Sequence, residues 1–401
     1  MPGPRLSERA RTAPPSPIRK LVPLADEARR RGIRVYGLNI GQPDIETPAS
    51  VLEAVRRADL KVLAYSPSQG TAEYRAALVD YYARHAIRLA ADEILVTTAG
   101  SEAILFAMAC TTNPGDEIII PEPLYANYLG FAAMLETRVV PISCDVETGY
   151  HLPRRDAIER LITPRTRAIL YCSPGNPTGT IYTNDEVAVL ADLCRKHDLF
   201  LISDEVYREF VYEGEKPKPV LTMAGLEDRA IMVDSISKRI SACGARIGCV
   251  ASRNHDFMAA ALKFAQARLS PPTFGQILGQ AAARLPAAYF DEMVSEYRRR
   301  RDVVHGALSA MPGVVCRRPS GAFYAMARFP VDDAEKFVVW MLTEFSDANE
   351  TTFLAPANGF YATPGLGKQE ARIAFVLNCD ALRRALEIVG LALQHYPGRI
   401  V

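Results

Sequence analysis

The sequence predicts an α/β fold, with a large domain on a mostly parallel β-sheet and a smaller α+β domain. Short apolar segments alternate with amphipathic ones between about residues 90 and 255. Several of the apolar segments are continuous runs, which is typical of strands buried on both faces of a parallel sheet. After about residue 290 the pattern changes to a long charged helix followed by short strands and helices, which indicates a second domain.

The strands and helices can be placed from these patterns. The expected strands are Ile94–Thr97, Glu117–Ile120, Ala168–Tyr171, Phe200–Ser203, Ala230–Asp234 and Ile247–Ala251. The expected helices include Glu102–Cys110, Asp185–His197, Tyr289 to about Met311, and a last one around Leu382–His395. Ligands of open α/β sheets bind beyond the carboxyl ends of the strands, so polar residues at those ends are the candidates for function.

The 401 residues are expected to divide into four segments. Residues 1–17 are rich in Pro and Arg and predict a flexible arm, and residues 18–48 predict a segment that packs with the small domain. Residues 49–290 would form the large domain and residues 291–401 the small C-terminal domain. Hydrophobic residues make up 49% of the chain and charged residues 23%, the usual mixture for a globular protein.

The overall charge and the cysteine pattern argue against several classes of protein. With 47 basic and 46 acidic residues, the chain has no excess charge to attract nucleic acid or an anionic membrane. We find no signal-peptide pattern and no apolar stretch of membrane-spanning length. The eight cysteines form no C-x-x-C pair and the six histidines have no metal-ligand spacing. We therefore expect a cytoplasmic protein with reduced thiols, no metal site and no nucleic-acid partner.

A turn with two hydroxyls and a lysine follows the strand that ends near Asp234. It reads Asp234-Ser235-Ile236-Ser237-Lys238, and Arg246 follows eight residues after the lysine. Hydroxyls and a guanidinium together suit a phosphate dianion. A partly desolvated lysine beside them has a lowered pKa and can attack an aldehyde. A solvated Lys-Arg turn is the alternative interpretation of this segment by itself.

Two further strand ends carry polar residues. Asp204-Glu205-Val206-Tyr207 follows a buried strand, where an acid needs a partner such as a protonated pyridine nitrogen. Tyr207 could bind the phenolic oxygen of the same ring, although Asp204 could also simply cap a following helix. The loop Ser173-Pro174-Gly175-Asn176-Pro177-Thr178-Gly179 holds Asn176 in a constrained turn, from which its amide can donate to a ring oxygen.

A fourth segment runs from a predicted strand into a helix. In Thr97-Thr98-Ala99-Gly100-Ser101-Glu102, small residues leave backbone N–H groups free to bind phosphate at a helix N-terminus. An ordinary Ser N-cap is the alternative. By contrast, Gly365-Leu366-Gly367 lacks the third glycine of a dinucleotide-binding loop, so we predict a turn there.

Together these four segments resemble the fold-type-I, pyridoxal-phosphate-dependent class I/II aminotransferases, and the chain is similar to bacterial aspartate aminotransferases. The loop S-P-G-N-P-T-G, the acid-x-x-Tyr and the S-x-S-K with its arginine occur in the family's order and at fitting separations. Pro17-Ile18-Arg19-Lys20 and Gly41-Gln42-Pro43-Asp44 also match the family's N-terminal region. The resemblance extends from about Ile18 to His395.

The resemblance implies a role for each matching residue. Lys238 would form the Schiff base with pyridoxal phosphate and then act as acid and base, with Asp204 on the pyridinium nitrogen. Asn176 and Tyr207 would bind the ring oxygen, and Tyr125 would stack on the ring. The residues expected around the phosphate are Ala99, Gly100, Ser101, Ser235, Ser237 and Arg246.

The resemblance also implies a homodimer and a substrate site. Tyr65 matches a residue that reaches the phosphate of the neighbouring subunit, and Arg372 matches the arginine that clamps the substrate α-carboxylate. Gly41, Asn176 and Tyr125 would also contact the substrate.

The residue that would bind the substrate side chain stays open. Ser101 stands where similar aspartate aminotransferases can have a lysine, and neither Arg268 nor Arg284 can be placed securely as the partner subunit's arginine that other members use. The amino donor could be aspartate-like, aromatic or neutral.

The expected function is transfer of an amino group between an L-amino acid and a 2-oxo acid such as 2-oxoglutarate. The first alternative is another pyridoxal-phosphate reaction on the same fold, such as β- or γ-elimination or replacement. A transcription regulator of the same fold would need a DNA-binding module, and the roughly seventeen residues before the domain are too few for a helix-turn-helix. A nicotinamide-dependent dehydrogenase would need a glycine fingerprint that the sequence lacks.

Overall fold

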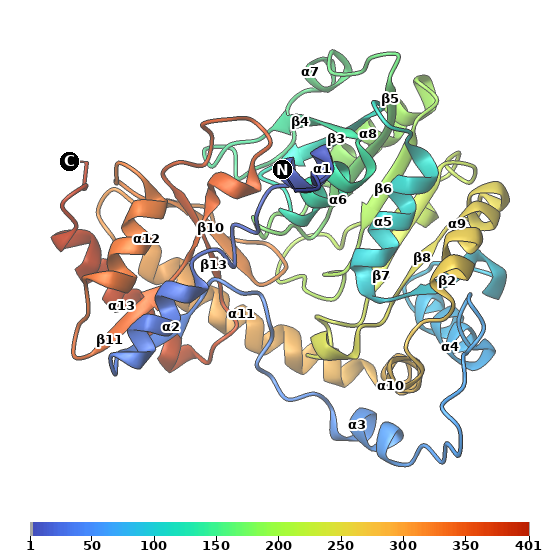
Figure 1. Ribbon diagram of the computed structural model, residues 1–401, viewed down its shortest axis with the longest axis horizontal. Helices are drawn as coiled ribbons and strands as arrows, with labels where there is room; N and C mark the ends of the chain where they lie inside the picture. The colour runs from blue at the N-terminus through green and yellow to red at the C-terminus, as the bar shows by residue number, and fades with distance from the viewer. Residues whose placement is uncertain (1–2, 401) are drawn as a thin grey trace.

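A computed structural model describes residues 3–400 of the chain. Figure 1 shows a large lobe built around a twisted sheet and a smaller lobe that contains the C-terminal third of the chain. The long helix α11 (Ala287–Ser309) runs from the large lobe into the smaller one. It begins two residues before the start predicted at Tyr289, directly after Pro286 in its N-cap position.

The large lobe contains a seven-stranded sheet of order β2-β8-β7-β6-β5-β3-β4. Its strands are β2 (Ile94–Thr97), β3 (Glu117–Glu122), β4 (Arg138–Ser143), β5 (Thr166–Cys172), β6 (Phe200–Asp204), β7 (Ala230–Ser235) and β8 (Gly248–Ala251). Strand β8 is antiparallel to β2 and β7, and the other neighbours are parallel. The prediction of a mostly parallel sheet is therefore confirmed.

All six predicted strands are present, and the sheet has one more. Strand β8 begins at Gly248, one residue later than predicted, and β3 extends two residues beyond Ile120. The additional strand, β4, lies at the edge of the sheet and is only partly buried. It has no continuous apolar run, since it includes Arg138 and Pro141, and so it gave no strand signal.

Consecutive residues of the central strands pack on opposite faces of the sheet. In β3, Ile118 and Ile120 belong to a core shared with α5 (Ala99–Thr111) and α9 (His255–Arg268), whereas Ile119 belongs to the core on the other face, shared with α8 (Asn184–Lys196). Burial on both faces is what makes the strands continuous apolar runs. The helices of this lobe are α3 (Ala49–Arg56), α4 (Ala72–Ala83), α5 (Ala99–Thr111), α6 (Asn127–Leu135), α7 (Arg155–Glu159), α8 (Asn184–Lys196), α9 (His255–Arg268) and α10 (Thr273–Ala283).

The smaller lobe is built on an antiparallel sheet of order β12-β13-β10-β9. Its strands are β9 (Val315–Cys316), β10 (Tyr324–Arg328), β12 (Ala355–Pro356) and β13 (Glu370–Ala374), and its helices are α12 (Ala334–Thr343) and α13 (Cys379–His395). In the β10–β13 pairing Met326 lies opposite Arg372 and Tyr324 lies opposite Ala374. Residues 365–367 form a turn in which both glycines have positive φ, as predicted.

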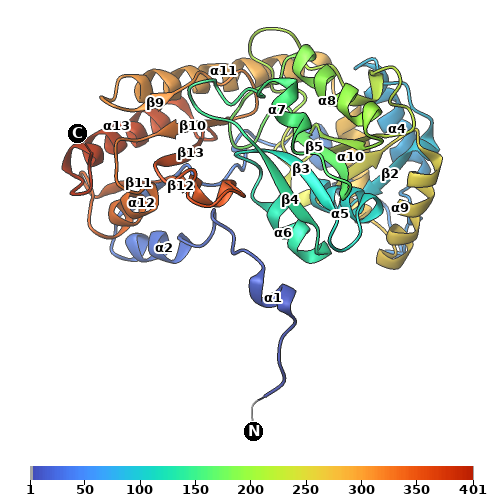
Figure 2. The ribbon, with the colours of Figure 1, turned by 90° about the horizontal axis from the view of Figure 1, so that it is seen from above.

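The N-terminal segment lies against the smaller lobe (Figure 1). Strand β1 (Arg34–Gly37) pairs in parallel with β11 (Glu350–Phe353), and α2 (Val22–Arg30) contacts α12. Helix α1 (Glu8–Thr12) buries no residue and projects from the body of the molecule in Figure 2, although it contacts α6 and its Arg9 forms an ion pair of 3.4 Å with Glu136. Within residues 3–400, no helix is both long and apolar enough to cross a lipid bilayer.

Candidate active site

A cavity of about 580 Å³ lies beyond the carboxyl ends of β5, β6 and β7. Every residue that the resemblance assigns to the cofactor or the substrate lines this cavity except Tyr65, which is 80% exposed and lies elsewhere on the surface. The predicted residues that line it are Gly41, Ala99, Gly100, Ser101, Tyr125, Asn176, Asp204, Tyr207, Ser235, Ser237, Lys238, Arg246 and Arg372. Residues that are distant in sequence therefore meet at the place where open α/β sheets bind ligands.

Asp204, the last residue of β6, is a buried carboxylate. Its Oδ2 accepts a hydrogen bond of 2.7 Å from Tyr128 Oη, and its Oδ1 accepts one of 3.2 Å from the backbone N–H of Val206. Burial raises the pKa of Asp204 to about 6. A turn rather than a helix follows it, so the alternative of a helix cap does not apply. The carboxylate lacks a cationic partner among the described residues. A pyridinium nitrogen could supply that partner.

Lys238 lies in the turn that follows β7, and it contacts Gly41, which is 197 residues away in the sequence. Its Nζ donates a hydrogen bond of 2.9 Å to the carbonyl oxygen of Gly41 and lies 3.8 Å from Cys243 Sγ. Burial lowers the pKa of Lys238, and the nearby Arg372 and Arg246 guanidinium groups act in the same direction. A larger fraction of neutral amine makes this lysine a better nucleophile than one in solvent. The alternative of a solvated Lys-Arg turn is therefore wrong.

Ser235 and Ser237 form the hydroxyl pair of the expected phosphate site. Their Oγ atoms are 2.7 Å apart, and Ser235 Oγ also donates to the carbonyl oxygen of Ile247 at 2.9 Å. Because Ser235 donates its one hydroxyl proton to Ile247, it can only accept from Ser237 across the 2.7 Å contact, so both hydroxyls are held in fixed orientations. Arg246 has one guanidinium nitrogen bonded to the carbonyl oxygen of Cys243 at 2.9 Å and lines the cavity.

The N-terminus of α5 forms the opposite wall of this pocket. The helix begins at Ala99 after Thr98, and Glu102 Oε2 accepts the backbone N–H of Thr98 at 2.8 Å. The alternative of a Ser101 N-cap is therefore wrong, and Ser101 lies inside the first turn. Gly248 allows this loop to approach β8, because a Cβ there would lie 2.8 Å from the carbonyl carbon of Ala99. The backbone N–H groups of the first turn are thus available to an anion.

Arg372 is the most buried cation of the cavity, at 1% exposure. Its Nη1 donates to Asn176 Oδ1 at 2.9 Å and its Nη2 donates to the carbonyl oxygen of Asn39 at 2.5 Å. Its Nε has no hydrogen-bond partner, although it is buried. The guanidinium also lies 4.5 Å from the centre of the Tyr324 ring, and burial lowers the pKa of Arg372. An unpaired buried N–H is costly, which indicates a site built for a ligand.

Tyr324, at the start of β10, is a site residue that the sequence analysis missed. Its hydroxyl is 2.9 Å from that of Tyr207, and a Cβ on Gly41 would overlap it at 1.8 Å. Gly41 is therefore needed to let the backbone touch this tyrosine. The sequence pattern showed only a short strand here, because the antiparallel β10–β13 pairing that brings Tyr324 beside Arg372 is long-range.

Tyr128 and Asn39 were missed as well. Tyr128 lies in the first turn of α6, three residues after Tyr125, and the two rings pack edge to face with their centres 5.4 Å apart. The short separation from Tyr125 in the sequence was the available signal for it. Tyr125 lines the cavity and its hydroxyl accepts a hydrogen bond of 2.7 Å from Asn127 Nδ2.

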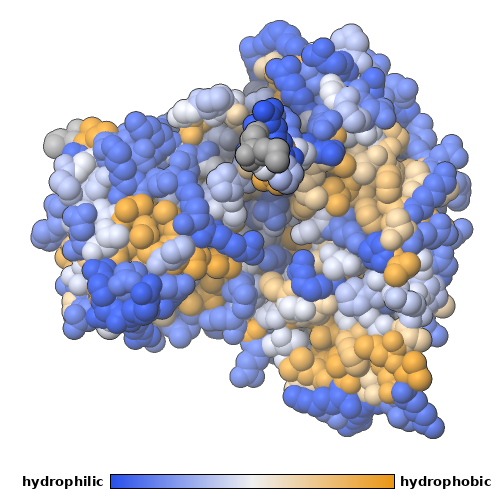
Figure 3. Space-filling view, viewed as in Figure 1, coloured by the Kyte–Doolittle hydropathy of each residue, from blue (hydrophilic) through white to orange (hydrophobic). Residues whose placement is uncertain are grey.

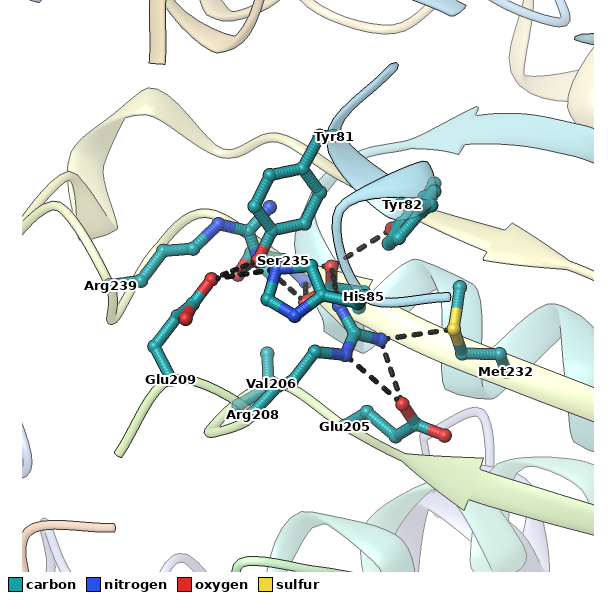
Figure 4. Close-up of polar contacts among 12 residues, drawn as sticks. Tyr81, Tyr82, His85, Glu205, Val206, Arg208, Glu209, Met232, Ser235 and Arg239 are labelled. Carbon is teal, nitrogen blue, oxygen red and sulfur yellow. Dashed lines mark hydrogen bonds and ion pairs between the residues drawn. The ribbon is translucent and has the colours of Figure 1, made fainter. Parts of the chain in front are cut away.

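A cluster of ion pairs lies behind the loops that carry Asp204 and Lys238 (Figure 4). Arg239 Nη1 donates to both carboxylate oxygens of Asp234, at 2.8 and 2.9 Å, and Arg208 Nη1 donates to the same carboxylate at 3.1 Å. Arg208 also pairs with Glu205 at 2.8 Å, and Tyr82 donates to Asp234 at 2.9 Å. We refer to Asp234, Arg208, Arg239, Glu205 and Tyr82 as the Asp234 cluster.

The two arginines considered from sequence for a substrate side chain do not line the cavity. Arg268 donates to Glu102 at 3.2 Å and to the carbonyl oxygen of Val96 at 3.1 Å, within its own chain. Arg284 caps the end of α10. Among residues 3–400 there is also no group of three or more His, Cys, Asp or Glu side chains arranged to hold a metal ion.

Comparison with known proteins gives consistent matches along the chain. The sequence model of the family described as aminotransferase class I and II matches residues 33–388. The chain is 32% identical over 392 residues to an aspartate/prephenate aminotransferase of Thermus thermophilus, covering 95% of this chain and 97% of that protein. It is 32% identical over 331 residues to aromatic-amino-acid aminotransferase 2 of Thermococcus litoralis, covering 80% of this chain and 83% of that one.

Solved structures agree with the sequence relatives. The fold is similar to that of a Thermus thermophilus aspartate aminotransferase mutant, with a TM-score of 0.88 and 30% identity, covering 98% of this chain and all of that one. It is also similar to an alanine aminotransferase of Pyrococcus furiosus, with a TM-score of 0.88 and 29% identity, covering 96% of this chain and 99% of that one.

Proposed function

Because the chain belongs to the class I and II aminotransferase family and is a pyridoxal-phosphate-dependent transaminase, we propose that Lys238 is the lysine that binds the cofactor and moves the substrate proton. The observation that carries this proposal is one cavity in which three buried ionisable groups lack full pairing. These are Lys238 with a lowered pKa, Asp204 with a raised pKa and Arg372 with a partner-free Nε.

The residues of the cavity fit pyridoxal phosphate. Asp204 would pair with the pyridinium nitrogen, which would offset the cost of burying its carboxylate. The ring oxygen would receive hydrogen bonds from Tyr207 and from the amide nitrogen of Asn176, whose oxygen is already engaged by Arg372. Tyr125 would stack on the ring. The phosphate would be held by Ser235, Ser237, Arg246 and the first turn of α5, which comprises Ala99, Gly100 and Ser101.

The reaction then depends on how the chain positions the amino acid. When bound, pyridoxal phosphate draws electrons from the substrate Cα and so weakens its C–H bond. Arg372 would hold the α-carboxylate through Nε and a terminal nitrogen, in the paired geometry that a guanidinium offers a carboxylate. Gly41, whose carbonyl oxygen accepts from Lys238, would border the same substrate. Lys238 Nζ would take the Cα proton from the donor and return one to Cα of the amino acid formed from the 2-oxo acid.

Borohydride reduction of the purified holoenzyme, followed by mass spectrometry of its peptides, tests the assignment of Lys238. The cofactor mass should be found on the peptide that contains Lys238, and its appearance on another lysine would overturn the assignment. Mixing the holoenzyme with each amino acid and following the cofactor's visible absorption then identifies the donors. Transfer of the amino group to 2-oxoglutarate separates transamination from elimination or replacement on the same fold.

We further propose a homodimer in which Tyr65 reaches the phosphate site of the partner subunit. In support, Leu60, Val62, Leu63 and Tyr65 are exposed on the segment between α3 and α4. Helices α3 and α10 lie side by side, and Figure 3 shows apolar surface over them. A run of exposed apolar side chains of this kind is typical of an interface.

Complementation between subunits tests the role of Tyr65. Y65A and K238A should each lose turnover, and mixing them after reversible dissociation should restore it. The restored site combines Lys238 of one chain with Tyr65 of the other. Absence of restored activity in mixed dimers would show that Tyr65 does not act across the interface.

The division into domains is part of the same proposal. Residues 49–290 would form the cofactor domain, and residues 18–48 would move with residues 291–401, which the pairing of β1 with β11 supports. Residues 1–17 would form an arm, which the full exposure of α1 supports. Limited proteolysis should remove the arm first. The eight cysteines, all of them free thiols, are consistent with a cytoplasmic location.

A further inference from the structure

Cys243 is a polar residue of the cavity wall to which the proposed function gives no role. It lies five residues after Lys238, at the start of the short 3-10 turn Cys243–Ala245, and it lines the cavity together with Gly244 and Arg246. Its side chain is half-buried. The thiol and the backbone carbonyl of Cys243 make three contacts, each with a residue of the proposed cofactor site.

These contacts fix the orientation of the Cys243 thiol. Sγ donates its one hydrogen to the carbonyl oxygen of Ser237 at 3.2 Å, so only its lone pairs remain for other groups. Lys238 Nζ donates to the same sulfur at 3.8 Å. On the other side of the turn, the carbonyl oxygen of Cys243 accepts from Arg246 Nη1 at 2.9 Å. The sulfur is therefore held as an acceptor that faces the lysine.

The neutral amine of Lys238 has two hydrogens and one lone pair to place. Burial lowers the pKa of Lys238 and so favours this neutral form. One hydrogen goes to the carbonyl oxygen of Gly41 at 2.9 Å and the other to Cys243 Sγ. Among residues 3–400, Nζ has no further hydrogen-bond partner. Because Cε and the two acceptors occupy three of the four tetrahedral directions, a single direction is left for the lone pair.

The direction of this lone pair matters for both steps that the proposed function assigns to Lys238. Formation of the Schiff base joins Nζ to the aldehyde carbon of the cofactor, and the carbonyl oxygen leaves as water with both amine hydrogens. In the proton transfer, the same lone pair takes the proton from Cα of the substrate. Each step requires the lone pair to be aligned with the reacting atom. Sulfur is a weak acceptor, so it can orient the amine and still release its hydrogen.

We propose that Cys243 is a positioning residue for Lys238, whose sulfur, together with the Gly41 carbonyl oxygen, turns the lone pair of the free amine toward the reacting atoms. The proposal rests on the assignment of Lys238 as the cofactor lysine. The thiol keeps its own hydrogen on Ser237, so it acts through the lysine and neither gives nor takes a proton in the reaction.

The rate at which apoenzyme takes up pyridoxal phosphate, followed through the absorption of the Schiff base, tests this role. In C243A the limiting rate at high pH should fall by about 2- to 10-fold, the effect of losing one hydrogen bond. C243S keeps a donor and an acceptor, so it should stay close to wild type. C316A is the matched control, because Cys316 is also half-buried but lies in β9, outside the cavity wall. A wild-type rate in C243A, or a C243S variant as slow as C243A, would overturn the proposal.

The pH profile of the same reaction separates positioning from simple loss of packing. Burial lowers the pKa of Lys238, Cys243 raises it, and Arg372 and Arg246 add to the lowering. Removing the thiol should therefore move the midpoint of the profile to lower pH while the limiting rate falls. A loosened wall would admit water and move the midpoint to higher pH, which would contradict the proposal. The substitution leaves in place the other titratable or charged side chains that line the cavity, which are Arg19, Tyr125, Cys172, Asp204, Tyr207 and Tyr324.

Proton transfer from the substrate gives a second readout. The holoenzyme would be assayed with aspartate, alanine and tyrosine, and the fastest of these would then be used in its Cα-deuterated form. In C243A the isotope effect on kcat should exceed that of wild type, because proton transfer limits turnover more strongly, and KM should change little. An isotope effect equal to that of C316A would show that Cys243 does not orient the lysine.

Binding of pyridoxamine phosphate, which needs no bond to Lys238, tests whether the rest of the site is intact. Its affinity should be the same in C243A and wild type, because the backbone carbonyl that holds Arg246 is retained. A loss of this affinity would mean that Cys243 supports the phosphate site, and the proposal would be wrong.

These measurements distinguish the two proposals. If borohydride fixes the cofactor to Lys238 at equal rates in wild type and C243A, the proposed function holds and the role of Cys243 is refuted. If the label is found on another lysine in the wild-type enzyme, the proposed function itself fails.

Discussion

The loops after β6 and β7 have two sides, and these differ in how their charges are paired. On the cavity side, Asp204 and Lys238 are buried and lack ionic partners, so burial shifts the pKa of each toward its neutral form. On the other side, Asp234 is equally buried. Burial there would raise its pKa, but Arg239 and Arg208 bring it below the usual value. Burial alone therefore does not set the charge state of these groups, because ion-pair partners can reverse its effect. The cavity side, whose groups lack such partners, is the side that we propose to bind the ligand.

Neighbours in the sequence alternate between the two sides. Lys238 faces the cavity while Arg239, the next residue, joins the Asp234 cluster, and Tyr207 and Arg208 divide in the same way. Figure 4 shows Arg208 and Arg239 on the paired side, and both donate to the Asp234 carboxylate. We infer that the Asp234 cluster fixes the two loops relative to each other, so that the cavity side can keep incompletely paired groups in place.

The largest effect is expected on the cavity side, from K238A. Loss of the attacking amine and of the proton carrier should lower turnover by at least about 10⁴-fold and abolish the borohydride-fixed label. The melting temperature of the apoenzyme should change little, because the lysine makes no ion pair there. K263A, at an exposed position of α9, is the control and should behave as wild type. If K238A keeps its turnover or its label, another lysine binds the cofactor and the assignment of Lys238 is wrong.

The comparison predicts the opposite pattern for D234N. Removing the carboxylate charge leaves the buried Arg239 guanidinium without its ion-pair partner and leaves Arg208 paired with Glu205 alone, so the free energy of unfolding should fall by about 3–5 kcal/mol. Urea unfolding monitored by circular dichroism measures this. D228N removes an exposed carboxylate paired with Arg229, and it should cost less than about 1 kcal/mol. If D234N is as stable as D228N, the cluster does not support the loops.

Asp204 gives a pH-dependent test of the unpaired side. Its pKa is about 6 in the folded apoenzyme and near 4 when unfolded, so the folded state binds more protons between these values. The contribution of Asp204 to stability therefore decreases as pH rises from about 4 to about 6, by about 3 kcal/mol. Comparing the free energy of unfolding in urea of the wild type and D204N at pH 4 and pH 7 isolates the contribution of Asp204. A difference that stays the same at both pH values would mean that Asp204 is not destabilised by burial.

Adding pyridoxal phosphate should remove that dependence. A pyridinium partner favours the carboxylate, so in the holoenzyme the Asp204 pKa should lie below its apoenzyme value. The wild-type holoenzyme should then lose no stability between pH 4 and pH 6 through this residue. The same two variants, measured with the cofactor bound, provide the check.

The residues of the site differ in how strong a signal they leave in the sequence, and this difference explains which of them could be predicted. Asp204 and Lys238 were found because polar residues directly follow buried apolar strands, and the glycine- and proline-rich loops marked their neighbours. The sheet was predicted for the same reason, apart from the edge strand β4, whose partial exposure leaves no apolar run.

The missed residues enter the site through long-range packing. Tyr324 comes from β10 and Asn39 from the segment after β1, and neither has a local pattern that distinguishes it from an ordinary strand or loop residue. Arg19 matched the family's N-terminal region, but nothing in its neighbourhood indicated that the turn carrying it would reach the cavity. Asp234 was read as the start of the lysine motif, whereas its side chain points away from the cavity toward two arginines.

The smallest effect is expected from Y324F, which tests whether the hydrogen bond between the Tyr324 and Tyr207 hydroxyls matters for the reaction. The Tyr324 hydroxyl is 2.9 Å from that of Tyr207, and removing it deprives Tyr207 of a buried partner. Since Tyr207 is proposed to bind the ring oxygen, kcat should fall by about 3- to 10-fold and the visible absorption of the cofactor should shift. Y289F is the matched control, because the buried Tyr289 hydroxyl has no partner and its loss should be silent. If Y324F and Y289F behave alike, the Tyr207–Tyr324 contact has no role in binding the cofactor. The pair would then be part of the structural framework, as the Asp234 cluster is, and not of the functional side of the cavity.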